Sequence, residues 1–128
     1  MKLVQLTLLT TVFVLFSTLN VVGQGRNRKS PEEMAKQQTE WMKKELKLSA
    51  EQEQKMYNIN LETAKKMRQT RERHSGNREA MQEEMKVTRR QKDKEMKEVL
   101  TKEQYELYKK KLDERRSNFQ NKKKGNKR

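Results

Sequence analysis

The sequence contains no cysteine, one proline and four glycines among 128 residues, and only 5% of its residues are aromatic. Without cysteine there are no disulfides, no thiolate metal ligands, no catalytic thiol and no lipidated cysteine. The scarcity of aromatic and turn-forming residues argues against a β-sandwich or an α/β fold. Apolar residues recur at helical spacing, so we expect an all-α protein.

Hydrophobic residues are also few, at 30%, whereas charged residues make up 39% of the chain. Such a chain has room for one small domain and no large core. The formal net charge of +14 favours anionic partners, which include nucleic acid, lipid head groups and acidic protein surfaces. Charge alone does not choose among them.

The N-terminal segment has the pattern of a secretory signal peptide. A basic start precedes an apolar run that ends at Val22, and Val21 and Gly23 suit the −3 and −1 positions of a cleavage site before Gln24. A retained membrane anchor is the alternative, because the run is nearly long enough to span a bilayer. Threonine, serine and asparagine dilute the run, and no basic cluster directly follows it, which favours cleavage and export.

Two similar motifs, Leu48–Gln52 and Leu100–Gln104, stand before helical runs. In each motif a hydroxyl residue can act as N-cap, and the glutamine at N3 can reach back to the N-cap amide, which makes a capping box. We expect a structural role for the motif residues, which are Leu48, Ser49, Gln52, Leu100, Thr101 and Gln104.

Midway between the motifs lies a turn signal, His74-Ser75-Gly76-Asn77. A chain that reverses there forms a helical hairpin and places the two motifs side by side. One unbroken helix through Gly76 is the alternative, since a lone glycine is tolerated within a helix at a cost of about 1 kcal/mol.

A third capping box begins at Ser30, with Pro31 at N1, and predicts a helix that ends near Leu46. Three further helices are expected, from Ser49 to Arg73, from Asn77 to Val99 and from Thr101 to Phe119. The expected organisation is a signal peptide over residues 1–23, a flexible lead-in over 24–30, a helical domain over 31–119 and a disordered basic tail over 120–128.

The apolar spacing also predicts which face of each helix points inward. The expected inner positions are Met34, Trp41, Met42 and Leu46 in the first helix; Gln52, Met56, Ile59, Thr63 and Met67 in the second; Ala80 or Met81, Met85, Thr88, Lys92, Met96 and Val99 in the third; and Tyr105, Tyr108, Leu112, Arg115 or Arg116 and Phe119 in the last. Long helices in one layer leave an apolar side uncovered, and a homodimer is the simplest way to cover it.

Signals of catalysis are poor. The single histidine, His74, stands in the expected turn among arginines, where a solvated loop residue is the simplest interpretation. No glycine-rich phosphate loop or nucleophile motif is present, and most carboxylates have a lysine at i+4, as on a solvated helix face. We expect no enzymatic activity, no metal site and no cofactor.

The methionines suggest a binding surface, because thioethers pack against irregular apolar partners. Three of them flank the turn among basic residues, which would suit capture of an unfolded chain. The candidate contacts are Lys65, Lys66, Met67, Arg68, Arg71, Met81, Met85, Arg89 and Arg90. A merely solvated basic face is the alternative interpretation.

The two motifs resemble the LTxxQ motif of the Spy/CpxP-like family of periplasmic stress proteins. Leu48-Ser49-x-x-Gln52 has serine in place of the usual threonine, and Leu100-Thr101-x-x-Gln104 matches fully. The resemblance covers about residues 34–119 and implies a cradle-shaped, antiparallel helical homodimer in the bacterial periplasm. Spy-like members are ATP-independent chaperones that hold unfolding proteins, and CpxP-like members also damp a membrane sensor kinase.

Three hypotheses about function follow. The first is a periplasmic holdase that needs no cofactor. The second is an envelope-stress regulatory module that binds an acidic sensor domain, and the third is a basic protein that coats anionic envelope surfaces through its tail. Nucleic acid is disfavoured as a partner by the export signal and by the scarcity of aromatic residues for base stacking.

Overall fold

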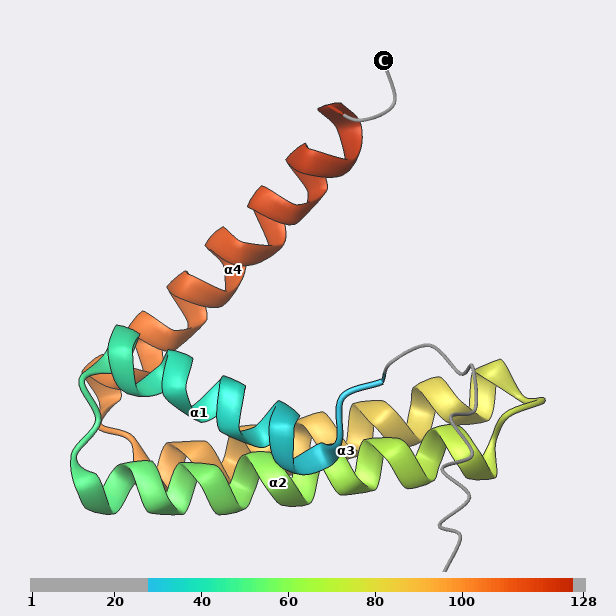
Figure 1. Ribbon diagram of the computed structural model, residues 1–128, viewed down its shortest axis with the longest axis horizontal. Helices are drawn as coiled ribbons and strands as arrows, with labels where there is room; N and C mark the ends of the chain where they lie inside the picture. The colour runs from blue at the N-terminus through green and yellow to red at the C-terminus, as the bar shows by residue number, and fades with distance from the viewer. Residues whose placement is uncertain (1–27, 126–128) are drawn as a thin grey trace, which may run out of the picture.

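The computed structural model describes residues 28–125, which form four α-helices (Figure 1). The helices are α1 (Pro31–Leu46), α2 (Ala50–Arg73), α3 (Arg78–Val99) and α4 (Lys102–Gly125). The described residues contain no strand, so the all-α prediction is confirmed. The predicted signal peptide and residues 24–27 of the predicted lead-in lie outside the described range.

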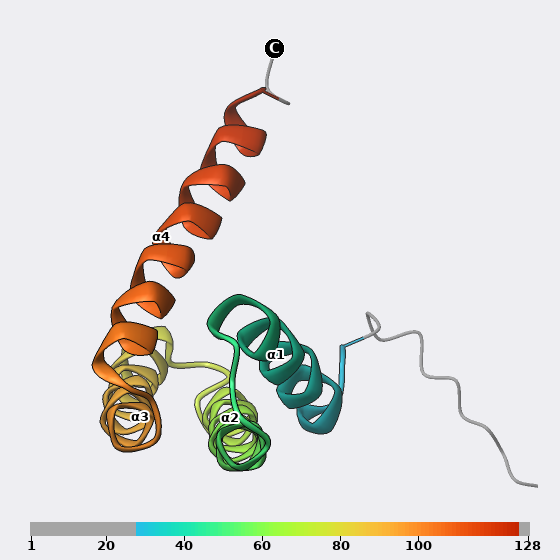
Figure 2. The ribbon, with the colours of Figure 1, turned by 90° about the vertical axis from the view of Figure 1, so that its left-hand side faces the viewer.

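Helix α2 lies between α1 and α3 and packs against both of them (Figure 2). α2 and α3 run antiparallel and reverse at residues 74–77, so the hairpin is confirmed and the unbroken helix is wrong. α4 starts at the end of α3, contacts α1 and then projects away from the other helices (Figures 1 and 2). The fold is a thin layer of three helices with one projecting arm.

Capping boxes start three of the helices, as the sequence predicts. At the start of α1, the Ser30 hydroxyl accepts from the Glu33 amide at 3.1 Å, and the Glu33 carboxylate accepts from the Ser30 amide at 2.9 Å. The same reciprocal pair joins Ser49 to Gln52 before α2 and joins Thr101 to Gln104 before α4. Each box satisfies amides that the first helical turn leaves without a partner.

Polar contacts of the backbone and of Asn77 close the hairpin turn. The His74 amide donates to the Thr70 carbonyl at 3.0 Å and ends α2, while the Asn77 side chain accepts from the Ala80 amide at 3.0 Å and starts α3. Gly76 does not have a positive φ, and a Cβ placed there would meet nothing within 4 Å. The turn therefore depends on the Asn77 cap and does not require glycine.

The core is small and lies at the motif end of the hairpin. Its buried residues come from α1, α2, α3 and both motifs: Met42, Leu46, Leu48, Met56, Met96 and Leu100. Trp41, Ile59, Val99, Tyr105 and Tyr108 pack against this cluster and are partly buried. Methionine and leucine at the motif end therefore supply most of the apolar burial that holds the helices together.

The predicted inner face of α2 was wrong in part. Met56 is buried and Ile59 packs against the core, as predicted. Asn60 and Ala64 are also buried, whereas Thr63 and Met67 are only partly buried. The reason is that α1 covers a second flank of α2: the Asn60 amide donates to the Thr39 hydroxyl of α1 at 2.9 Å. The inner face predicted for α3 is confirmed at Met85, Thr88 and Met96.

Helix α4 contains no buried residue and continues past Phe119 to Gly125. The prediction of a disordered tail was therefore wrong for residues 120–125, because lysine, asparagine and glutamine permit an anchored helix to continue where no proline intervenes. Phe119 is 61% exposed, so its predicted inward position was also wrong. No described helix has the combined length and apolar character that crossing a membrane requires.

Candidate functional site

The two motif glutamines meet directly at one end of the hairpin. The Gln52 side-chain amide donates to the Gln104 side-chain oxygen at 2.6 Å, and the Gln104 amide donates back to the Gln52 oxygen at 3.1 Å. Each amide also donates to a carbonyl at the end of a helix: Gln52 to Val99 at 3.1 Å, and Gln104 to Leu46 at 3.2 Å. Each glutamine thus joins the start of its own helix to the end of another.

Every hydrogen-bonding position of this glutamine pair is used. Each side-chain oxygen accepts from its own N-cap amide and from the opposite glutamine, and each side-chain nitrogen donates twice. A satisfied, partly buried amide pair has no donor or acceptor left for a ligand. This geometry agrees with the structural role predicted for the motifs. Their predicted side-by-side placement is confirmed.

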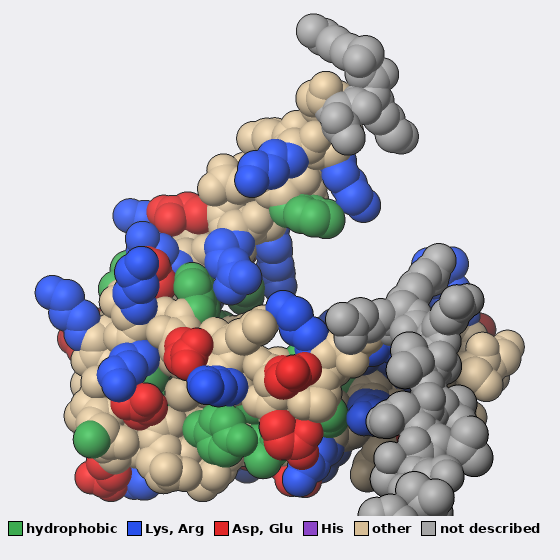
Figure 3. Space-filling view, in the orientation of Figure 1, with side chains coloured by type: hydrophobic (Ala, Val, Ile, Leu, Met, Phe, Trp, Pro, Cys, Tyr) green, Lys and Arg blue, Asp and Glu red, His purple; other side chains and the backbone are tan. Residues whose placement is uncertain are grey.

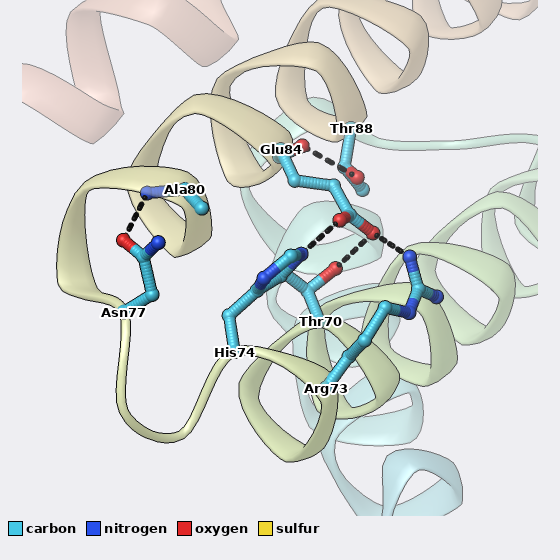
Figure 4. Close-up of polar contacts among 7 residues, drawn as sticks. All are labelled: Thr70, Arg73, His74, Asn77, Ala80, Glu84 and Thr88. Atoms are coloured by element: carbon cyan, nitrogen blue, oxygen red, sulfur yellow. Dashed lines mark hydrogen bonds and ion pairs between the residues drawn. The ribbon is translucent and has the colours of Figure 1, made fainter.

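At the turn end of the hairpin, polar contacts converge on one carboxylate (Figure 4). The Glu84 carboxylate of α3 accepts from the Thr70 hydroxyl at 2.9 Å and from the Arg73 guanidinium at 2.7 Å, and its second oxygen lies 2.7 Å from His74 Nε2. These bonds, that of His74 first, hold the pKa of Glu84 below its ordinary value. The cluster fastens the end of α2 to α3.

His74 is less exposed than the sequence suggests. Its side chain is 25% exposed and is bound to Glu84, so its interpretation as a solvated loop residue was wrong. Within residues 28–125, no group of three or more histidine, aspartate or glutamate side chains is arranged to hold a metal ion.

Lys92 occupies the polar position that the sequence places on the inner face of α3. Its side chain is half-buried, and burial lowers the pKa of its ammonium group to about 8. Met96 lies one turn away and is fully buried. Lys92 is therefore a partly buried cation beside an apolar core.

The methionines that the sequence proposes as binding contacts differ in their exposure to solvent. Met67 and Met81 are partly exposed, but Met85 is only 9% exposed, so its assignment to the binding surface was wrong because it packs between α2 and α3. Met34 was expected to point inward and is instead 38% exposed. The methionines with accessible surface in the described chain are Met34, Met67 and Met81.

The candidate cations do not form one cluster. Arg68 and Arg71 of α2 face the start of α1 and line a hollow together with Met34. Arg89 and Arg90 are exposed on α3, which packs on the other flank of α2 (Figure 2). The structure therefore brings Arg68 and Arg71 together and places Arg89 and Arg90 on a different helix.

Some of these cations are already paired. Lys66 contacts Glu62 at 3.8 Å, and Arg68 contacts Glu72 at 3.0 Å. The remaining candidates make no ion pair with a described carboxylate; they are Lys65, Arg71, Arg89 and Arg90. Blue side chains lie over much of the face shown in Figure 3, with red and green ones between them.

Sequence reasoning missed the contribution of the segment before α2. Arg28, Lys29 and Met34 lie far along the chain from Arg68 and Arg71, yet they line the same hollow. The one available signal was the Ser30 capping box, which fixes where α1 begins. How α1 lies across α2 does not follow from that local pattern.

The chain was compared with protein families, with curated proteins and with solved structures. No curated protein and no solved structure matches the chain. Residues 22–108, which include α1, α2, α3 and both motifs, match one protein family. The chain therefore belongs to the family described as "Domain of unknown function (DUF4890)".

Proposed function

We propose that the protein is an ATP-independent holdase chaperone that binds unfolding proteins on the basic, methionine-containing surface of its helical layer. The observation that carries this proposal is that Met34 is exposed, and Met67 and Met81 are partly exposed. Their helices also carry cations that make no ion pair with a described carboxylate, such as Arg71 and Arg89. Positive charge speeds capture of acidic chains, and flexible thioethers then bury apolar side chains of varied shape. Both contacts are weak enough to permit release.

The location and assembly belong to the same proposal. The paired LTxxQ-like motifs and the signal-peptide pattern support a periplasmic Spy/CpxP-like protein. The outer half of α4 supports a homodimer, because Phe119 is exposed on a helix with no buried residue. A second copy that covers this arm would supply packing that an isolated helical segment lacks.

Light scattering tests the holdase. A chemically denatured client is diluted into buffer with a stoichiometric amount of the chain from Gln24 to Arg128 and without nucleotide. We expect suppression of aggregation that survives moderate salt, since apolar contacts are not screened. Suppression that disappears as soon as salt is added, or no suppression, would contradict the proposal and favour the regulatory module.

A matched pair of variants separates methionine contacts from general apolar surface. Replacing Met67 and Met81 by glutamine should weaken suppression, because the thioethers are the proposed apolar contacts. Replacing Val87 by glutamine is the control, since Val87 is 62% exposed and is not a candidate contact. Equal loss in both proteins would show that the methionines have no special role.

One observation favours a second candidate function, the coating of anionic envelope surfaces. The exposed outer half of α4 carries Phe119 followed by Lys122, Lys123 and Lys124, and a basic helix with an aromatic side chain suits a lipid surface. Deleting residues 121–128 should abolish co-sedimentation with anionic vesicles if coating is the function. The holdase predicts unchanged suppression of aggregation by the same deletion.

A further inference from the structure

A small hollow lies where the start of α1 crosses the C-terminal half of α2. Its volume is about 160 Å³, and four cations line it: Arg28, Lys29, Arg68 and Arg71. Glu72 is the one carboxylate in the lining. The hollow is therefore strongly basic, and it lies far along α2 from the glutamine pair that closes the motif end.

Two of the four cations have no partner among the described residues. Arg68 contacts Glu72 at 3.0 Å, and the Lys29 ammonium donates to the Gln37 side chain at 2.7 Å. Arg28 and Arg71 make no side-chain hydrogen bond or ion pair within residues 28–125. Arginine presents several fixed donors that match a carboxylate, so these two side chains are available to an acidic ligand.

Part of the wall of the hollow is apolar. Pro31 and Ala64 line it and are buried, and Met34 lines it with 38% of its surface exposed. An exposed thioether beside unpaired guanidinium groups offers apolar contact and charge within one site. A ligand that fits both features carries a carboxylate next to an apolar side chain.

The size of the hollow limits the ligand. Sites for drug-sized molecules and cofactors usually enclose about 300–1,000 Å³, so this hollow suits a single anchoring side chain. Interfaces commonly place one aromatic or aliphatic anchor in such a pocket and surround it with polar contacts. An acidic, partly apolar segment of a protein meets this description.

We infer that the hollow between α1 and α2 is a docking site for unfolded protein segments in which an aromatic or aliphatic side chain stands beside aspartate or glutamate. The inference rests on the proposed holdase function and names the class of segment that the surface selects. The apolar side chain packs on Met34, and the neighbouring carboxylates pair with Arg28 and Arg71.

The test is a fluorescence-anisotropy titration of the chain from Gln24 to Arg128 with a labelled twelve-residue peptide whose centre is Asp-Phe-Glu. Replacing Arg28 and Arg71 by glutamine should weaken binding by about tenfold, because two charge-assisted contacts are lost. The matched control replaces Arg89 and Arg90 by glutamine, which removes the same charge from α3. This control should weaken binding by less than about threefold, because it removes only a long-range electrostatic attraction that salt screens.

A second pair of measurements isolates the apolar contact. Met34→Gln should weaken binding of the Asp-Phe-Glu peptide and leave binding of an Asp-Ala-Glu peptide unchanged. Circular dichroism of every variant checks that helicity is retained. Equal losses in the Arg28/Arg71 and Arg89/Arg90 variants, or indifference of the phenylalanine peptide to Met34→Gln, would overturn the docking site.

The outcomes also distinguish this inference from the holdase itself. If the unaltered chain suppresses aggregation and the Arg28/Arg71 variant binds the peptide as well as the unaltered chain, the docking site is wrong and the holdase stands. If the unaltered chain does not suppress aggregation, the holdase fails whatever the peptide does. Binding to anionic vesicles that depends on Arg28 and Arg71, without peptide binding, would assign the hollow to lipid and overturn the inference.

Discussion

The two ends of the α2–α3 hairpin are built from different chemistry. At the motif end, Gln52 and Gln104 exchange neutral hydrogen bonds above a core of buried methionine and leucine. At the turn end, the Glu84 carboxylate accepts hydrogen bonds from Thr70, Arg73 and His74. Most of the apolar burial and the satisfied amide pair lie at the first end, where the ion pairs Lys43–Glu53 and Lys111–Glu45 also join helices, whereas the polar contacts of the second end converge on one carboxylate.

This difference separates assembly from binding. Apolar burial and satisfied amides are not weakened by ionic screening and carry no group that titrates in the ordinary pH range. Ion pairs at exposed sites are screened and contribute little to stability, so the turn end can change its contacts without unfolding the layer. The comparison therefore predicts that substitutions at the motif end act on stability, and that substitutions at the turn end act on binding and on pH dependence.

The largest effect is expected from the core methionine of α3. Met96 is 1% exposed, and Met96→Ala should lower the free energy of unfolding by about 2–5 kcal/mol, because it leaves a cavity. Met81→Ala at the turn end should cost less than about 1 kcal/mol, because Met81 is partly exposed. Urea denaturation followed by circular dichroism compares the two, and equal costs would erase the distinction between the ends.

The glutamine pair gives the next effect. Gln52→Ala should lower the free energy of unfolding by about 1–3 kcal/mol, since it leaves the Ser49 amide, Gln104 and the Val99 carbonyl without their partner. Because Gln52 and Gln104 bond to each other, the double substitution should cost less than the sum of the single ones. Additive costs in the double-mutant cycle would show that the pair does not act as a unit.

Lys92, near the motif end, gives an effect of opposite sign. Burial lowers its pKa to about 8, so the charged form is disfavoured in the folded chain. The resulting destabilisation is fully present below pH 8 and is relieved as the pH rises from 8 toward the ordinary value of 10.5. Lys92→Met should raise the free energy of unfolding at pH 7 by about 1–3 kcal/mol. Equal stability of the two proteins at pH 7 would contradict this account.

Glu84 should control the pH dependence at the turn end. Its folded pKa lies below the ordinary value of 4.5, so its contribution is present above pH 4.5 and is lost as the pH falls through the folded value. The difference in unfolding free energy between the unaltered chain and Glu84→Gln should therefore shrink below pH 4.5. Unfolding free energies measured from about pH 3 to 5 follow this change. A difference that does not change with pH would show that the carboxylate charge does not fasten the turn.

Local patterns predicted the helix starts and the hairpin, because a capping box involves residues three positions apart. The Ser30, Ser49 and Thr101 boxes all form. The direct bond between Gln52 and Gln104 could not be predicted from either motif alone, since it depends on the register of α2 against α3. That register follows from packing across the whole hairpin.

The placement of α1 explains the remaining differences. The sequence treats α3 as the neighbour of α2, but α1 covers the other flank, buries Asn60 and Ala64, and leaves Met34 in a basic hollow. The periodicity of apolar residues predicts how many residues of a helix face inward, but it does not predict which of two neighbouring helices covers them. The helical residues 120–125 were missed for another reason, because their composition suits both a solvated helix and a disordered tail.

Hydrogen–deuterium exchange of the chain from Gln24 to Arg128, with and without a denatured client, tests most directly the claim that one end assembles and the other binds. We expect a bound client to slow exchange at the start of α1 and in residues 64–81, and to leave exchange around the glutamine pair unchanged. Slower exchange confined to the motif end, or spread evenly over all four helices, would contradict the account.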